Sequence, residues 1–216
     1  MPVRHQPDFN TFAQACQVLG VNLTPAIYQS LQQYACLIEE WNKKINLVSR
    51  KDIDRILTYH IIDSLAACRF IPHGARCADI GSGAGLPGIP LAIVRPDINM
   101  TLIESIKKKC RFLEAAVSEL GLKNTELIAG RAEALSPLGC DILLSRLTSA
   151  LDRTLRYCRF HLKPGGLLIL YKSLNWEAEL KSAAKIIDRF NLRWLRTESI
   201  SLPFTEITRH FVIITT

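Results

Sequence analysis

Residues 79–85 read Asp-Ile-Gly-Ser-Gly-Ala-Gly and directly follow a short apolar run that begins near residue 77. Glycines at positions 81, 83 and 85 allow backbone conformations that other residues resist, and they let the chain pass within contact distance of a ligand. In an open parallel sheet, ligands bind at the carboxyl ends of the strands, where the chain turns from strand to helix. The stretch therefore predicts a strand, a ligand-binding turn and a helix.

Downstream of this turn, short apolar runs alternate with segments of helical periodicity, which is typical of a parallel sheet covered on both faces. The expected strands lie at residues 77–81, 100–104, 125–129, 141–145 and 167–172, and the expected helices at 88–94, 106–120, 149–161 and 175–190. This order predicts an α/β fold with a doubly wound, mostly parallel sheet.

Both ends of the chain depart from this alternation. Residues 193–201 and 209–215 are rich in β-branched side chains and have no crossover helix between them, so they predict an antiparallel closing pair. Near the other end, Thr24-Pro25 predicts the start of a helix that runs to about residue 43, and residues 53–65 predict one or two more helices. We expect a helical N-terminal region, residues 1–71, packed on a core domain, residues 72–216.

The composition points to one main domain in the cytoplasm. The chain has 216 residues, 48% of them hydrophobic, but no apolar run long enough to span a bilayer and no signal-peptide core at its start. Its seven cysteines are an odd number without a Cys-x-x-Cys pair, so we expect reduced thiols and no metal site.

The charge favours an acidic partner. Lys and Arg number 27 against 20 Asp and Glu, a formal net charge of +7. Nucleic acid is the commonest such partner of a soluble basic protein, although a solvated basic surface without a partner fits as well. Basic residues concentrate at 43–44, 50–51, 107–111 and 153–159.

Two acids bear on the ligand of the glycine turn, and one of them, Asp79, discriminates between the candidate cofactors. Gly83, Gly85 and Gly88 also satisfy the dinucleotide pattern, which keeps a nicotinamide-dependent oxidoreductase as an alternative. Asp79 favours S-adenosylmethionine, because a carboxylate suits its cationic methionine moiety and would repel a pyrophosphate. Glu104 can accept hydrogen bonds from the ribose hydroxyls of either cofactor, or it can cap the following helix.

Longer motifs are shared with one family. They are His-Ile-Ile-Asp-Ser-Leu at 60–65, Asp-Ile-Gly-Ser-Gly-Ala-Gly-Leu-Pro-Gly-Ile-Pro-Leu at 79–91, Gly-Arg-Ala-Glu at 130–133 and Ser-Arg at 145–146. Together they resemble the bacterial small-subunit ribosomal RNA guanine-N7 methyltransferases, the RsmG or GidB family. The resemblance covers residues 41–172, and the run at 85–91 is far more specific than the glycines alone.

The resemblance implies a class I, Rossmann-like methyltransferase that moves a methyl group from S-adenosyl-L-methionine to N7 of a guanine in 16S ribosomal RNA. S-adenosyl-L-homocysteine would be the product, and the partner would be the RNA or the small ribosomal subunit. We expect a monomer. A methyltransferase acting on a non-RNA substrate would share the cofactor site, and a non-catalytic RNA-binding module would have no use for it.

Site residues follow from the same resemblance. It implies that Gly81 and Leu86 contact the cofactor, that Ala132 and Glu133 flank its adenine, and that Arg146 lies at the methionine end or beside the target base. Ala132 can instead be an ordinary packing residue. Glu133 can instead be a solvated acid in the first turn of a short helix.

A second set of residues is implied on the catalytic side. His60 and Asp63 are three residues apart, so they share one helical face and can reach the cleft together, although the spacing alone favours a histidine satisfied at an interface. The resemblance adds them to Arg146 and Lys172 as catalytic residues. The chain departs from the family at Leu147-Thr148 and at Ser173, which bears on the placement of the target base.

Overall fold

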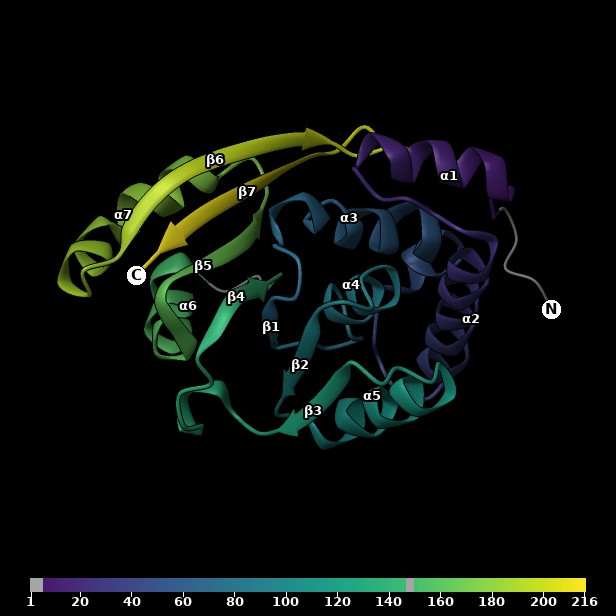
Figure 1. Ribbon diagram of the computed structural model, residues 1–216, viewed down its shortest axis with the longest axis horizontal. Coiled ribbons are helices and arrows are strands. Elements are labelled where there is room, and N and C mark those ends of the chain that lie inside the picture. The colour runs from purple at the N-terminus through teal and green to yellow at the C-terminus, as the bar shows by residue number, and fades with distance from the viewer. Residues whose placement is uncertain (1–5, 147–149) are drawn as a thin grey trace.

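The computed structural model describes residues 6–146 and 150–216 and is built around a seven-stranded sheet of order β3-β2-β1-β4-β5-β7-β6 (Figure 1). The strands are β1 Arg76–Ile80, β2 Asn99–Glu104, β3 Thr125–Ala129, β4 Cys140–Ser145, β5 Leu162–Lys172, β6 Arg193–Ser201 and β7 Thr208–Thr215. Pairs among β1 to β5 are parallel, whereas β7 runs antiparallel to both of its neighbours. The doubly wound, mostly parallel sheet and its antiparallel closure are confirmed.

Helices follow the strands as the sequence predicts. They are α4 Gly88–Val94, α5 Lys107–Glu119, α6 Leu151–Cys158 and α7 Trp176–Arg189. The helix expected at 149–161 ends in a 3-10 turn, η5 Arg159–His161, and residue 149 lies outside the described residues.

The N-terminal segment is helical but less regular than its periodicity suggests. Its helices are α1 Phe9–Val18, α2 Pro25–Asn42, the 3-10 helices η1 Arg50–Arg55 and η3 Cys68–Phe70, the π-helix η2 Ile56–Ile61 and the single α-turn α3 Ile62–Leu65. Thr24 caps α2, since its hydroxyl accepts a hydrogen bond from the Ile27 amide at 3.2 Å. A wide π-turn of the kind found at functional sites thus carries His60 into α3.

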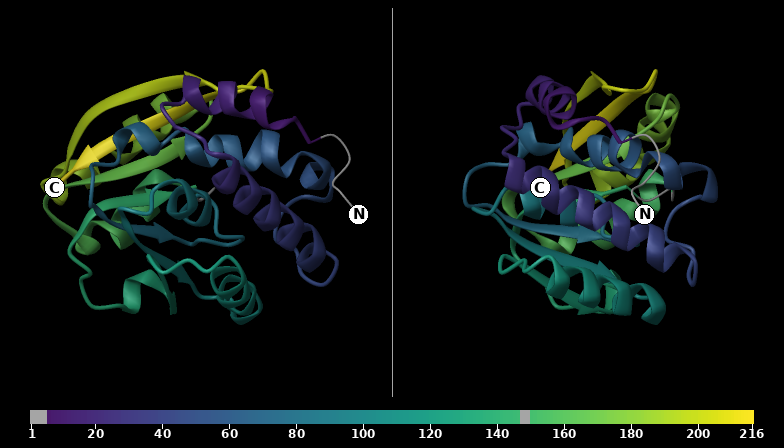
Figure 2. Two further views of the ribbon diagram at one scale, coloured as in Figure 1. Left: turned by 45° about the vertical axis from the view of Figure 1, so that its right-hand side comes forward. Right: turned by 90° about the vertical axis from the view of Figure 1, so that its right-hand side faces the viewer.

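The two faces of the sheet are covered by different helices (Figure 2). Alternate strand residues such as Leu144 and Ile169 join helices α1 to α5 in one hydrophobic cluster. Their neighbours Leu143 and Leu168 pack with α6 and α7 in a second cluster. The N-terminal helices therefore share their core with the sheet, while the boundary between residues 71 and 72 stays a prediction.

In the described ranges, no helix has both the length and the apolar character needed to cross a membrane. All seven cysteines are free thiols, and six of them are buried. Over the same residues, His, Cys, Asp and Glu side chains form no group of three or more that is suited to a metal ion.

Candidate functional site

The glycine turn adopts the backbone conformation that its three glycines predict. Gly81, Gly83 and Gly85 have φ values of 73°, 60° and 81°, a left-handed region that favours glycine. The amides of Gly81 and Ser82 donate to the Ile103 carbonyl at 2.9 and 3.0 Å, and the Ser82 hydroxyl accepts from the Ile103 amide at 3.1 Å. The turn is thereby held against the carboxyl end of β2.

Glu104, the last residue of β2, ties the turn to the following helix. One carboxylate oxygen accepts hydrogen bonds from the Ser105 and Ile106 amides, both at 2.8 Å, and the other accepts from the Gly83 amide at 2.9 Å. These bonds fix the two residues that precede α5, and α5 itself has no side-chain cap, so the capping alternative for Glu104 is not borne out. Oε2, which accepts only the Gly83 amide among these bonds, keeps capacity for a ligand hydroxyl.

A cavity of about 370 Å³ opens at the carboxyl ends of β1 and β2. Its walls include four residues predicted to bind the cofactor, which are Gly81, Glu104, Ala132 and Glu133. The walls also include Lys109 of α5, Arg131, and Arg153 and Tyr157 of α6. Tyr157 was missed by the sequence reasoning, because a tyrosine within a helical pattern carries no local signal of a ligand site.

Asp79 and two neighbours lie beneath the turn rather than in the cavity wall. Asp79 is fully buried, its Oδ2 accepts a hydrogen bond from the Gly88 amide at 3.0 Å, and its Oδ1 has no hydrogen-bond partner. Burial raises the pKa of this carboxyl to about 7. Gly85 packs against α4, where a Cβ would come within 2.5 Å of Ile89 Cδ1, and Leu86 is buried. Cofactor contacts by Asp79, Gly83, Gly85 and Leu86 stay predictions.

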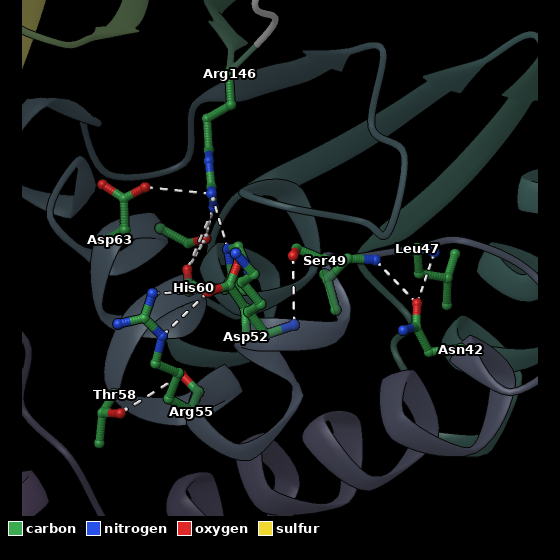
Figure 3. A network of polar contacts seen from close by, with 12 residues as sticks. Asn42, Leu47, Ser49, Asp52, Arg55, Thr58, His60, Asp63 and Arg146 are labelled. Carbon is green, nitrogen blue, oxygen red and sulfur yellow. Dashed lines mark hydrogen bonds and ion pairs between the residues drawn. The ribbon is translucent and has the colours of Figure 1, made fainter.

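A second constellation surrounds Arg146, which directly follows β4 (Figure 3). Its Nη1 donates to Ser64 Oγ at 3.0 Å and to the His60 carbonyl at 3.3 Å. Its Nη2 lies 3.2 Å from His60 Nδ1 and 3.3 Å from Asp63 Oδ2. The structure thus brings together three of the four residues assigned to the catalytic side, and their catalytic roles stay predictions.

His60 is a neutral ring in this setting. Burial and then the Arg146 cation lower its pKa to about 4. A guanidinium only donates hydrogen bonds, so Nδ1 must accept and the ring proton resides on Nε2. Nε2 lies 3.6 Å from Asp52 Oδ2, and Asp52 also pairs with Arg55 at 2.7 Å.

Asp63 is held by a second arginine that the sequence reasoning missed. The carboxylate is 2% exposed, and its two oxygens accept hydrogen bonds from Nε and Nη2 of Arg209 in β7 at 2.7 and 3.1 Å. Arg209 also donates to the Lys172 carbonyl at 3.3 Å. Lys172 is itself buried, and its Nζ donates to Glu179 of α7 at 2.7 Å.

Two buried tyrosines connect the constellations to the N-terminal helices. The Tyr34 hydroxyl of α2 donates to the Ala84 carbonyl in the glycine turn. The Tyr171 hydroxyl of β5 donates to the Ser64 carbonyl at 2.9 Å. In the sequence both read as core positions, so neither was assigned to the site.

Two solved structures, one bound to AdoMet and one described as a SAM-dependent methyltransferase, share this architecture. The crystal structure of M. jannaschii TYW2 in complex with AdoMet matches with a TM-score of 0.60 and 14% identity, covering 80% of this chain and 78% of that chain. A SAM-dependent methyltransferase from Aquifex aeolicus matches with a TM-score of 0.60 and 17% identity, covering 77% of this chain and 96% of that chain. The class I, Rossmann-like fold is confirmed.

Sequence comparisons reach a specific family. A curated relative, ribosomal RNA small subunit methyltransferase G of Chlorobium limicola, is 38% identical over 83% of each chain. The protein of the same name from Neisseria meningitidis serogroup C is 32% identical over 91% of this chain and 92% of its own. The family model described as rRNA small subunit methyltransferase G matches residues 27–208. The resemblance stated from the motifs is confirmed, and the chain belongs to the GidB family of rRNA small subunit methyltransferases G.

Proposed function

We propose that this chain transfers a methyl group from S-adenosyl-L-methionine to N7 of a guanine in small-subunit ribosomal RNA. The observation that carries the proposal is the cavity at the carboxyl ends of β1 and β2, where Gly81, Glu104 and Ala132 meet on a chain of this family. We also propose that the enzyme acts as a monomer in the cytoplasm.

The residues around the cavity fit the cofactor. Oε2 of Glu104 is placed to accept a hydrogen bond from a ribose hydroxyl. Ala132 and Glu133 lie on the wall beyond β3, which supports their proposed contact with the adenine. Asp79 contributes a carboxyl with one unpartnered oxygen beneath the turn, which suits the cationic methionine end.

S-adenosyl-L-methionine would supply an electrophilic methyl group on its sulfonium, and the N7 lone pair would form the new C–N bond as the C–S bond breaks. Guanine N7 carries no proton, so positioning and desolvation matter more than a general base. The protein side fits this requirement, because a pKa of about 4 makes His60 a weak base whose Nδ1 already accepts from Arg146, and Asp63 is held by two arginines. These residues orient groups rather than remove a proton.

RNA binding is supported by the charge around the cavity. Lys109, Arg131 and Arg153 are part of its walls, and the chain as a whole carries a net charge of +7. N7 faces the major groove, which side chains cannot easily reach inside an A-form helix. The target guanine is therefore expected in a loop or splayed out of a helix.

The test is mass mapping of modified nucleotides in ribosomal RNA from cells that lack the gene. One N7-methylguanosine of the small subunit should disappear and return when the gene is restored. A G83V copy should not restore it, since the turn needs a φ of +60° at that position. If every N7-methylguanosine persists in the deletion strain, the substrate assignment is wrong. Tight binding of NADH without binding of S-adenosylhomocysteine would reverse the cofactor assignment.

A further inference from the structure

A groove of about 610 Å³ lies between η1 and the turn that joins β6 to β7. It is lined by Arg55, Phe204, Thr205, Glu206 and Ile207. The turn lies beside α1, at the end of β6 that points away from the chain's C-terminus (Figures 1 and 2). None of these residues belongs to the cofactor cavity.

Phe204 stands where the turn favours glycine. The Thr205 amide donates to the Leu202 carbonyl at 3.3 Å, which closes a four-residue turn with Pro203 in second place and Phe204 in third. Phe204 has a φ of 63°, the left-handed value that a turn with proline in second place usually assigns to glycine or asparagine. A bulky residue held in this conformation points to a role for its side chain.

The Phe204 ring packs on a neighbouring ring and is still partly exposed. It stacks on the buried ring of Phe12 from α1, with centroids 6.1 Å apart and planes 9° apart. The residue nevertheless remains 43% exposed and forms part of the groove. The contact with Phe12 holds the ring in place, and the exposed part of the residue is available to a molecule in the groove.

The groove is connected to the Arg146 constellation through Arg55. The Arg55 guanidinium donates to Asp52 at 2.7 Å, Asp52 lies 3.6 Å from His60, and His60 accepts from Arg146 at 3.2 Å (Figure 3). The Arg55 side chain is 53% exposed. A molecule in the groove is therefore linked to Arg146, which the resemblance places at the methionine end or beside the target base, through the side chains of Arg55, Asp52 and His60.

We propose that this groove binds a nucleotide of the RNA substrate near the target guanine, with its base stacked on Phe204. The proposal rests on the proposed function. Stacking on an exposed aromatic ring binds any base, because every base presents a π-face. Arg55 offers a cation to the phosphate, and exposed Glu206 offers an acceptor to a base amino group.

The test compares F204L with F204Y in the full chain. Leucine retains an aliphatic contact with Phe12 but has no aromatic face, whereas tyrosine keeps the ring. With purified small subunits as substrate, F204L should raise KM for the subunit on the order of tenfold. F204Y should behave as the wild type, and kcat, the affinity for S-adenosylhomocysteine and Tm should change little in both variants.

Ultraviolet crosslinking supplies a readout that a purely structural role would not give. Irradiated complexes of the wild type with small subunits should yield the tryptic peptide 197–209 carrying a nucleotide. An unmodified peptide in the wild type, or an unchanged KM in F204L, would overturn the proposal. If F204L proves unstable, the wild-type crosslink alone decides. A wild type that methylates no subunit refutes the proposed function, whereas an active wild type without the crosslink refutes only the groove.

Discussion

Asp79 shows how one buried carboxyl couples stability to pH. Its pKa rises from 3.8 to about 7, chiefly because burial disfavours the charged form. Between these two pH values the unfolded chain has lost the proton that the folded chain still holds. This group therefore lowers the stability of the fold as pH rises from about 4 to about 7, and its effect is constant above that range.

D79N should remove this dependence. Asparagine can still accept the hydrogen bond from the Gly88 amide, but it has no charge to bury. The free energy of unfolding of D79N should exceed that of the wild type by an amount that grows with pH. The difference should reach about 4 kcal/mol at pH 8, since one pKa unit corresponds to about 1.36 kcal/mol. Urea unfolding at pH 5 and pH 8 measures it. D97N is the control of opposite sign, because hydrogen bonds from Arg95 hold the pKa of Asp97 far below 3.8. Parallel pH curves for D79N and the wild type would contradict the expectation.

R146A should separate activity from stability. Without Arg146, Asp63 keeps both hydrogen bonds from Arg209, so no carboxylate is left buried alone. We expect methyl transfer to fall on the order of 100-fold through lost positioning, while the free energy of unfolding falls by only about 1–2 kcal/mol.

R95A provides the matched control for R146A. The Arg95 side chain is 21% exposed against 18% for Arg146, and it pairs with Asp97 outside both constellations. The R95A variant should have a lower free energy of unfolding but an unchanged turnover per folded molecule. Initial rates with labelled cofactor, read beside thermal melts, measure both quantities. Equal rates for R146A and the wild type would remove Arg146 from the mechanism.

At the scale of elements, local sequence signals predict the positions of most strands. They fail where pairing with a neighbouring strand overrides the local preference. β5 begins at Leu162, five residues before the predicted start at 167. Pro164, Gly165 and Gly166 mark a turn in any local reading, yet the segment stays beside β4 across a register shift between Cys140 and Ile142. The irregular helices at residues 50–65 likewise depend on packing that the hydrophobic periodicity does not encode.

The site residues likewise fall into those that local sequence signals reveal and those that only packing brings to the site. Residues of the glycine turn, Glu104 and Arg146 could be found because each lies at a strand end beside a short motif. Arg209 and Tyr34 could not, since their partners lie 146 and 50 positions away in the chain. Both residues stand within apolar patterns, and their polar contacts arise only when the elements pack together.

Y34F tests whether α2 shapes the cofactor turn. The variant leaves the Ala84 carbonyl without its buried donor, so the turn should lose order. We expect the affinity for S-adenosylhomocysteine to fall by about 1 kcal/mol, roughly fivefold. Y28F is the matched control on the same helix, because its hydroxyl donates to the Pro7 carbonyl, far along the chain from the turn. Isothermal titration on both variants should show the loss only in Y34F, and equal affinities would mean that the turn orders itself.

Across the whole molecule, residues of the N-terminal segment and of the last strand meet at the constellation around Arg146. His60 and Asp63 come from the N-terminal segment, and Arg209 comes from the last strand. β7 reaches this place only because it runs antiparallel and begins at the edge where the parallel strands end (Figure 1). The constellation is therefore complete only when the N-terminal segment and the closing strand have both docked.

Net charge acts at this largest scale, and its distribution predicts how binding depends on salt. Binding of small subunits by the wild type should weaken at least tenfold between about 50 and 200 mM KCl, because cations on the RNA backbone are released. The affinity for S-adenosylhomocysteine should stay nearly constant. Lys107 and Lys108 are exposed at the start of α5, next to the cavity, whereas Lys181 and Lys185 are exposed on α7, which packs in the other cluster.

K107E/K108E and K181E/K185E change the net charge equally, so comparing them isolates position from total charge. If RNA follows the cavity edge, the K107E/K108E variant should bind subunits at least tenfold more weakly than the wild type. Its slope of log affinity against log salt should be lower by about one to two. The α7 pair should keep the wild-type slope. Filter binding across the salt series measures both. Identical losses in the two double variants would mean that the basic charge acts without regard to position, and the cavity edge would then not be the path of the RNA.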